Sequence, residues 1–407
     1  MLGNEINIMT DIGVEQFALL ASLLIFAGFV LVPVSRRIGA PILLLVLLAG
    51  MLAGEDGPGG LQFADFSAAY SVGSIALAII LFAGGIETRT GSIKAALAPA
   101  ILLSTIGVVV TAGVLGLCAH LILGVPLEYA LLLGAVVGST DAASTFLLIQ
   151  QSRTKLSQRL SDTLTLESGL NDPVAIFATL AMTSVVNAGH PLSGGDFVEF
   201  LPMLTLQLGV GTLIGLVTGY CLSLLIGRIQ LSEGLYPPMI LSAAMAVYFG
   251  TTLLQGSGFL AIYLCGLMIA LNGHMRVSRI RQFSEGLQWL SQIALFLMLG
   301  LLVTPSTLEA AILPALAFSA LLIFVARPVA VLVCAAPLKF KSNETAFLSW
   351  VGLRGAVPIF LAIFPVITPG PVGVEFFNTV FVVVVVSLVL QGWTISPIAR
   401  LLKLDTP

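Results

Sequence analysis

Charged residues are scarce in this sequence. Asp, Glu, Lys and Arg make up 9% of its 407 residues, whereas hydrophobic residues make up 58%. Soluble domains contain roughly 25% charged residues, so this composition excludes one. The short alternating segments of a transmembrane β-barrel are also missing. The composition, with a mean hydropathy of +1.08, predicts an all-α polytopic membrane protein.

Cysteine and histidine are too few and too scattered to form a metal centre. The four cysteines lie singly in apolar runs without CxxC spacing, so neither a metal site nor a disulfide framework is predicted. His120 lies in an apolar run without a partner in sequence, and we interpret it as a packing residue. We therefore predict no cofactor, no enzymatic activity and no nucleic-acid partner. The first 14 residues also lack a basic region and carry Glu5 and Asp11, which is not typical of a cleavable signal peptide.

Apolar windows long enough to cross about 30 Å of hydrocarbon recur thirteen times. They cover approximately residues 15–35, 40–55, 67–86, 95–123, 128–149, 161–186, 199–227, 235–253, 258–272, 285–304, 309–335, 345–367 and 374–399. We predict a single transmembrane domain over residues 1–407. In it the seventh segment links two six-helix units, about 15–186 and 235–399.

The basic residues support this count. Fifteen of the 17 Lys and Arg residues follow odd-numbered segments. The loops after even-numbered segments, and the N-terminal leader, contain none. The positive-inside rule then predicts an N-terminus outside and a C-terminus in the cytoplasm. The other two basic residues, Arg327 and Arg354, lie inside apolar segments.

A polar cluster interrupts the sixth segment. It consists of Glu167, Ser168, Asn171 and Asp172, in the run L-E-S-G-L-N-D-P. Ionisable groups at this depth cost roughly 2.5–3.5 kcal/mol on insertion scales and usually have a function. Ser168 lies one helical turn before Asp172, and Pro173 leaves the carbonyl of Gly169 without its usual donor. These oxygens suit a hard cation or a proton; the alternative is a polar network that only holds helices together.

Two segments contain sequences that favour breaks in the helix. Segment five carries Gly-Ser-Thr-Asp at 138–141, and segment twelve carries Gly-Leu-Arg-Gly-Ala-Val-Pro at 352–358. Both are fifth in their six-helix unit, and because they are seven segments apart the two units have opposite topology. Interrupted segments at matching positions mark the binding site of many secondary transporters. We expect Asp141 to offset the positive end of one half-helix and Arg354 the negative end of the other. The alternative is a pair of glycine-rich packing seams.

Glu87 and the predicted roles of three buried charges complete the set of candidates. Glu87 closes the third segment, where it either reaches the cation path or is an interfacial charge near Arg89. Arg327 precedes Pro328, which kinks the helix, and we expect Arg327 to have a structural role with a buried acid as its partner. Glu167 and Arg354 are predicted to form a buried ion pair that supports the site.

These motifs together resemble the NhaP-type monovalent cation/proton antiporters, closest to the bacterial potassium/proton branch. The residues that carry the resemblance are Gly138–Asp141, Glu167–Pro173, Ala326–Pro328 and Val351–Pro358. The resemblance implies thirteen helices, two inverted repeats with crossed discontinuous helices, a homodimer and elevator-like alternating access. It implies that Asp172 binds the ion and the proton, that Ser168 and the Thr140 region are further ligands, and that Asn171 is the partner of Asp172.

These inferences predict exchange of K⁺ or Na⁺ for H⁺ across the bacterial inner membrane. Burial favours the protonated form of Asp172 and a bound cation favours the charged form, so the two ions compete for one carboxylate. Since Asn171 is neutral, the exchange is expected to be one-for-one and electroneutral. Glu87 matches a pattern of sodium-selective relatives, which leaves the choice of cation open. The alternatives are a cation channel or channel-like subunit, and a transporter of organic anions. Many relatives continue into cytoplasmic regulatory domains, and such a region is absent here or has been removed.

Overall fold

The computed structural model describes residues 14–38, 40–88, 93–141, 145, 156–189, 194–272, 276–338 and 340–404. Within these ranges the chain forms helices and their connections, with one isolated β-bridge between Gly54 and Leu61. Seven helical stretches are long and apolar enough to cross a membrane, and α2, α6, α11 and α16 are shorter apolar helices. The expected all-helical membrane fold is confirmed, and the exact count of thirteen spans stays a prediction.

The first unit contains eight named elements. They are α1 (Val14–Ile38), α2 (Ile42–Ala53), α3 (Phe66–Glu87), α4 (Ile93–Leu102), the π-helical turn η2 (Leu103–Gly107), α5 (Val108–Leu123), α6 (Leu127–Val136) and α8 (Gln158–Ala188). These bounds agree with the predicted segments to within a few residues. The second half of the predicted fifth segment lies outside the described residues, apart from Thr145.

A long helix, α9 (Gly194–Arg228), which we predicted to be the linker, lies between the two units in the sequence. The second unit contains α10 (Tyr236–Leu253), α11 (Gly258–Leu271), α12 (Val277–Leu301), α13 (Glu309–Leu321), the π-helical turn η5 (Leu322–Ala326), α14 (Arg327–Ala335), α15 (Ser342–Trp350), α16 (Ala356–Ile367) and α17 (Val374–Leu401). Three short 3₁₀ turns join them: η3 (Glu233–Leu235), η4 (Pro305–Thr307) and η6 (Ala336–Leu338).

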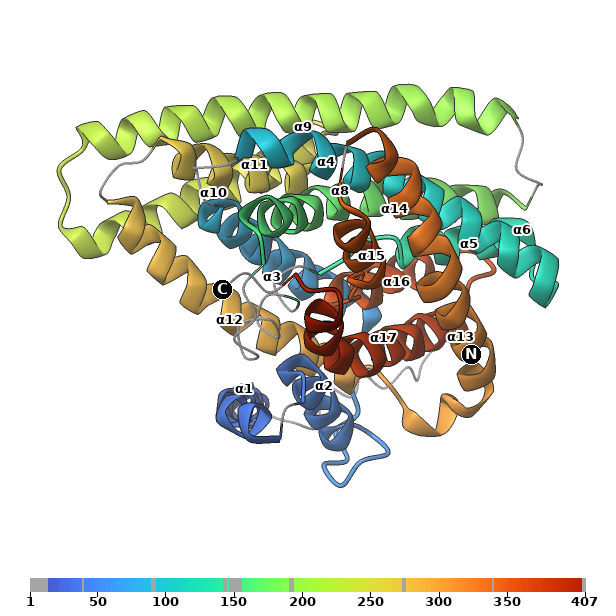
Figure 1. The fold of residues 1–407 in the computed structure, drawn as a ribbon. Helices are drawn as coiled ribbons and strands as arrows, with labels where there is room; N and C mark the ends of the chain where they lie inside the picture. The colour runs from blue at the N-terminus through green and yellow to red at the C-terminus, as the bar shows by residue number, and fades with distance from the viewer. Residues whose placement is uncertain are drawn as a thin grey trace.

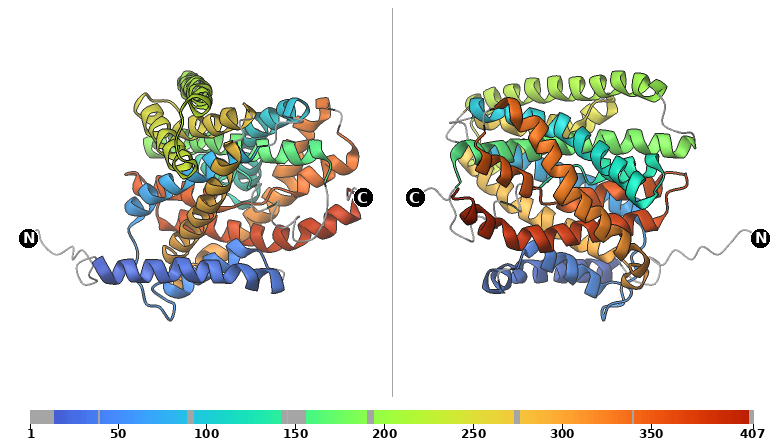
Figure 2. Two further views of the ribbon diagram at one scale, coloured as in Figure 1. Left: turned by 90° about the vertical axis from the view of Figure 1, so that its left-hand side faces the viewer. Right: turned by 45° about the vertical axis from the view of Figure 1, so that its right-hand side comes forward.

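The linker helix and the first helix lie at opposite edges of the bundle. α9 runs along one edge, and α1 with α2 lies at the other (Figures 1 and 2). Their outward faces are apolar: Leu213 is 65% exposed and Phe26 is 67% exposed. The remaining helices enclose the core between these edges, where the buried polar residues gather.

The two units share irregularities at matching positions, as expected of two structural repeats. Each has a π-helical turn in its fourth predicted segment, η2 in the first and η5 in the second. Contacts are reciprocal, since η2 packs on α14 and η5 packs on α5. Likewise α4 packs on α8, and α13 packs on α17. Such single π-turns inside α-helices are rare and frequently lie at functional sites.

Both predicted breaks are present, with one difference in extent. α6 ends at Val136 and the chain leaves helical geometry before Asp141, while α15 ends at Trp350 and α16 begins at Ala356. Pro358, which we had placed within the second break, belongs to the first turn of α16. Proline is tolerated there because the first amides of a helix have no intrahelical acceptor.

Candidate functional site

The two breaks lie against each other and are joined by a backbone hydrogen bond. The amide of Asp141 in the first break donates to the carbonyl of Leu353 in the second, at 2.8 Å. Gly355 makes this approach possible, because a Cβ at that position would collide with the Asp141 carboxylate. The close contact therefore fixes where the non-helical stretches cross.

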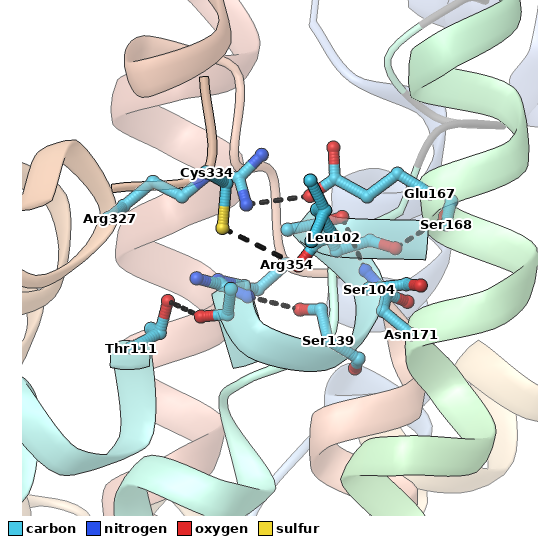
Figure 3. Close-up of polar contacts among 12 residues, drawn as sticks. Leu102, Ser104, Thr111, Ser139, Glu167, Ser168, Asn171, Arg327, Cys334 and Arg354 are labelled. Carbon is cyan, nitrogen blue, oxygen red and sulfur yellow. Dashed lines mark hydrogen bonds and ion pairs between the residues drawn. The ribbon is translucent and has the colours of Figure 1, made fainter. Parts of the chain in front are cut away.

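Opposite charges lie at the half-helix ends that the crossing brings together. The Asp141 side chain touches Gly355, the residue just before α16, where the helix dipole is positive. The Arg354 guanidinium donates to the carbonyl of Ser139, just past the end of α6, where the dipole is negative (Figure 3). Arg354 is 1% exposed. Asp141 and Arg354 therefore lie at the half-helix ends where the sequence analysis expected them, and their roles there stay a prediction.

Helix α8 brings its polar face to the first break. The hydroxyl of Ser168 donates to the carbonyl of Thr140, and the amide of Asn171 donates to the Thr140 hydroxyl at 2.8 Å. The described residues thus place three of the predicted ligand residues together. The predicted role of each as a cation ligand stays a prediction.

Asp172 lies on the same helix, and one of its carboxylate oxygens makes no hydrogen bond within the described residues. Its side chain is buried, and Oδ1 has no hydrogen-bond partner within the described part of the chain. Asp172 is close enough to Asp141 for the two carboxylates to interact electrostatically. A buried polar atom without a partner is costly, and a native structure that keeps one usually has a use for it.

One residue near Asp172 was missed by the sequence reasoning. Tyr263 of α11 stacks over Gly169 so closely that a Cβ at Gly169 would lie inside contact distance of the ring. Its hydroxyl is buried, has no partner among the described residues, and lies near Asp172 and Thr88. The signal was present, since Tyr263 is an isolated polar-tipped residue in an apolar segment.

The predicted pairing of Glu167 with Arg354 is wrong. Glu167 forms its ion pair with Arg327, whose Nη1 lies 2.7 Å from Oε1 (Figure 3). Both side chains are almost fully buried, at 1% and 3% exposure. Arg327 is the first residue after the π-helical turn η5 and reaches across to α8. Arg354 is instead held by the Ser139 carbonyl at the crossing. The buried acid suggested as a partner for Arg327 is therefore Glu167.

Glu87 lies apart from the crossing. It ends α3, is exposed, and has Arg281 and Glu285 of α12 as its charged neighbours. The Arg281 Nε donates to the Ile86 carbonyl at 3.2 Å, which ties the ends of α3 and α12 together. Arg89, the neighbour considered from the sequence, lies outside the described residues. Whether Glu87 takes part in the cation path stays a prediction.

The fold and the site together define a class of protein. Two discontinuous helices that cross near a buried carboxylate, within two related helical units, are typical of inverted-repeat secondary transporters. The model of the family described as "Sodium/hydrogen exchanger, transmembrane" matches residues 21–401. The chain belongs to this family.

Individual relatives agree with the family. The chain is 46% identical over 389 residues to the K(+)/H(+) antiporter NhaP of Alkalimonas amylolytica, covering 96% of this chain and 67% of the relative. It is 43% identical to the K(+)/H(+) antiporter NhaP2 of Shewanella oneidensis, covering 97% and 68%. A probable Na(+)/H(+) antiporter of Methanocaldococcus jannaschii is 26% identical, covering 94% and 96%.

Solved structures support the fold. The structure of the sodium proton antiporter MjNhaP1 from Methanocaldococcus jannaschii at pH 8 superposes with a TM-score of 0.80. It is 23% identical to this chain and covers 93% of it and 97% of the solved chain. At this identity the likeness concerns the fold alone.

Proposed function

We propose that this protein exchanges a monovalent cation for a proton, and that Asp172 binds the two in turn. The observation that carries the proposal is the buried Oδ1 of Asp172, which has no hydrogen-bond partner among the described residues. Asp172 lies one helical turn after Ser168, whose hydroxyl bonds to the Thr140 carbonyl. Carboxylate, hydroxyl and carbonyl oxygens are the ligands that hard cations prefer. Water-free surroundings favour a bound proton, and a cation replaces it at the same oxygens.

The charges around the crossing support a stoichiometry of one cation for one proton. Five ionisable side chains gather there: Asp141, Glu167, Asp172, Arg327 and Arg354. Three are acidic and two are basic, so the fully ionised group carries a formal charge of −1. One proton or one monovalent cation on Asp172 brings it to zero. A neutral group crosses the membrane interior at far lower cost than a charged one, which couples the two fluxes.

The relatives favour potassium as the cation. Those named K(+)/H(+) antiporters are 42–46% identical to this chain, whereas the one named a probable Na(+)/H(+) antiporter is 26% identical. We further infer a homodimer in the bacterial inner membrane, with the basic loops, and therefore the Glu87 end of α3, in the cytoplasm. The exposed apolar faces of α1 and α9 then contact lipid or a second copy.

The test is exchange by the full chain in proteoliposomes that contain a pH-sensitive dye, with K⁺, Na⁺ or Li⁺ added outside. We expect proton movement only when a cation gradient is imposed, with K⁺ the most effective and no dependence on membrane voltage. A channel would pass current without counterflow, and a voltage-dependent rate would contradict the one-for-one stoichiometry.

Asp172→Asn is the matching variant. The amide is nearly isosteric but cannot alternate between proton and cation, so we expect exchange to fall to the level of empty liposomes while the protein elutes as folded material. Asp162→Asn, in the same helix about three turns towards its start, serves as the control. Exchange by Asp172→Asn at the parental rate would exclude this carboxylate as the shared site.

A further inference from the structure

One face of α12 carries polar side chains inside the bundle. Four of them are buried: Ser284, Gln288, Ser291 and Gln292, with exposures of 4 to 8%. Their spacing of three and four residues places them on a single helical face. Over residues 284–292 this face extends about 12 Å along the helix.

Within the described part of the chain, these side chains do not form a structural hydrogen-bond network. Gln288 Oε1 is buried without a partner among the described residues. Nor do the described residues provide a side-chain hydrogen bond for Ser284, Ser291 or Gln292. Elsewhere buried hydroxyls bond to the carbonyl four residues back, as Thr179 and Ser319 do at 2.8 and 2.7 Å. Polar groups that are buried without protein partners need water or an ion.

The polar face points towards the transport site and away from the bundle edge. The next residue along this face is Leu295. Leu295 and Phe360 of α16 both pack against Gly73 of α3, where an added Cβ would lie 3.3 Å from Leu295 Cδ1 and 2.8 Å from Phe360 Cδ2. The opposite face of α12 carries Ile293 and packs on Gly28 of α1. The polar side chains are therefore on the side of α3 and α16.

The contacts along α3 fix the depth of this face. Ile86 lies beside Arg281 at one end and Gly73 beside Leu295 at the other, so α3 and α12 are antiparallel. Tyr70, earlier in α3, stacks on Phe360 at 5.0 Å and also meets Phe364, so α16 runs parallel to α12. The start of α16, where Asp141 touches Gly355, consequently lies about one turn back from the Leu295 level. That is the level of Ser291 and Gln292.

The other end of the polar face lies beside a cluster of charged side chains, which we call the mouth. Glu87 and Glu285, both exposed, lie within electrostatic reach of each other and of Arg281. Just inside this mouth, Gly84 of α3 faces open space, since a Cβ there would have no heavy atom within 4 Å. The acidic pair attracts cations, and the next groups inward along α12 are Ser284 and Gln288.

We propose that the polar face of α12 is a hydrated wall along which the monovalent cation passes between the Glu87–Glu285 mouth and the crossing, with the Gln288 carbonyl oxygen as a transient ligand. Amide and hydroxyl oxygens substitute for part of the ion's hydration shell. Weak successive contacts allow both entry and release. This role rests on the proposed exchange function and adds Gln288 and Glu285 to the residues that serve it.

The kinetic test is Gln288→Leu in proteoliposomes, with exchange measured against cation concentration on the mouth side. Loss of one polar contact corresponds to about a fivefold rise in the half-saturating cation concentration. The maximal rate should change less. The matched control is Gln282→Leu, the same substitution on the exposed face of α12, which should leave both quantities unchanged. An unchanged half-saturating concentration in Gln288→Leu overturns the proposal.

A labelling test does not depend on exchange. Ser284→Cys should react with a charged, membrane-impermeant thiol reagent applied from the mouth side, well above the background of the four native cysteines. Ile293→Cys, on the face that packs against α1, should stay at that background. If Ser284→Cys reacts no more than Ile293→Cys, the polar face of α12 is not reached by water, and the proposal is overturned. If the parent protein fails to exchange cations, the proposed function fails, whereas the labelling still reports on the wall.

Discussion

Helices α8 and α17 hold equivalent positions in the two units, yet their polar side chains are used differently. In α17 each buried polar group is paired. The amide of Arg354 donates to Ser387 at 3.0 Å, Ser387 donates to Gln391 Oε1 at 2.5 Å, and Gln391 donates to the Trp350 carbonyl at 2.7 Å. This chain of bonds fastens the second break to α17.

α8 reaches the first break in the same way but leaves acceptors open. Ser168 and Asn171 bond to Thr140, while Asn171 Oδ1 and Asp172 Oδ1 have no partner among the described residues. The buried polar groups of α17, which holds the second break, are thus bonded, whereas α8, which holds the first break, retains acceptor oxygens without a partner. Acceptor oxygens without a hydrogen-bond partner keep all their lone pairs for an ion. The proposed exchange therefore belongs to the first unit, and the second unit supports it.

The largest effect on stability is expected at Glu167 of α8, whose carboxylate is already paired with Arg327. Arg327→Met removes the partner of Glu167 and leaves a buried carboxylate unpaired, which should cost about 3–5 kcal/mol of folding free energy. The measurement is thermal unfolding of the detergent-purified protein. The control is Arg279→Ala, because the Arg279–Glu233 pair is 58% and 67% exposed and such pairs contribute at most about 1 kcal/mol. Equal destabilisation by both variants would contradict a supporting role for the buried pair.

A smaller loss of folding free energy should follow from removing the Ser387 hydroxyl, which links Arg354 and Gln391 on α17. Ser387→Ala leaves the Arg354 amide and Gln391 Oε1 without their partner, at a cost of about 1–3 kcal/mol. Because this group touches no proposed ligand, the half-saturating cation concentration should not change. Unfolding and exchange assays on the same preparation separate the two quantities. A change in cation affinity without a change in stability would reverse the roles assigned to the two helices.

The matched substitution on α8 should give the opposite result. Ser168→Ala removes a proposed ligand, so the half-saturating cation concentration should rise about fivefold, the equivalent of one polar contact. Thermal stability should change less than in Ser387→Ala. Comparing the two serine variants side by side tests the contrast directly, since each loses one hydroxyl. Identical profiles would mean that both helices are merely structural.

Sequence reasoning found the parts of the site that are local along the chain. The spans, the two breaks and the Asp172 cluster follow from hydropathy, glycine content and helical spacing. It could not decide which arginine pairs with Glu167, because Arg327 and Arg354 both lie in apolar segments and only the tertiary fold sets their distances. Tyr263 was missed for the same reason, since its place near Asp172 depends on a glycine in another helix.

The smallest effect on stability is expected near the start of α17, where hydrogen bonds join this helix to the loop residues Thr307, Ser306 and Asp56. Asn378 donates to Thr307 at 3.0 Å, and the amide of the adjacent Ser306 donates to Asp56 Oδ2 at 2.7 Å. Hydrogen bonds from Ser306 lower the pKa of Asp56 below its usual value.

A lowered folded-state pKa means that the stabilisation is complete above the ordinary Asp range, about 4, and disappears as the pH falls through the folded-state value. Because Asp56 is fully exposed, the effect should be slight and should weaken with added salt. Thermal midpoints should therefore fall slightly more between pH 6 and pH 3 in the parent than in Asp56→Asn. A parallel fall in both proteins would show that this contact does not help to hold the α17 end in place.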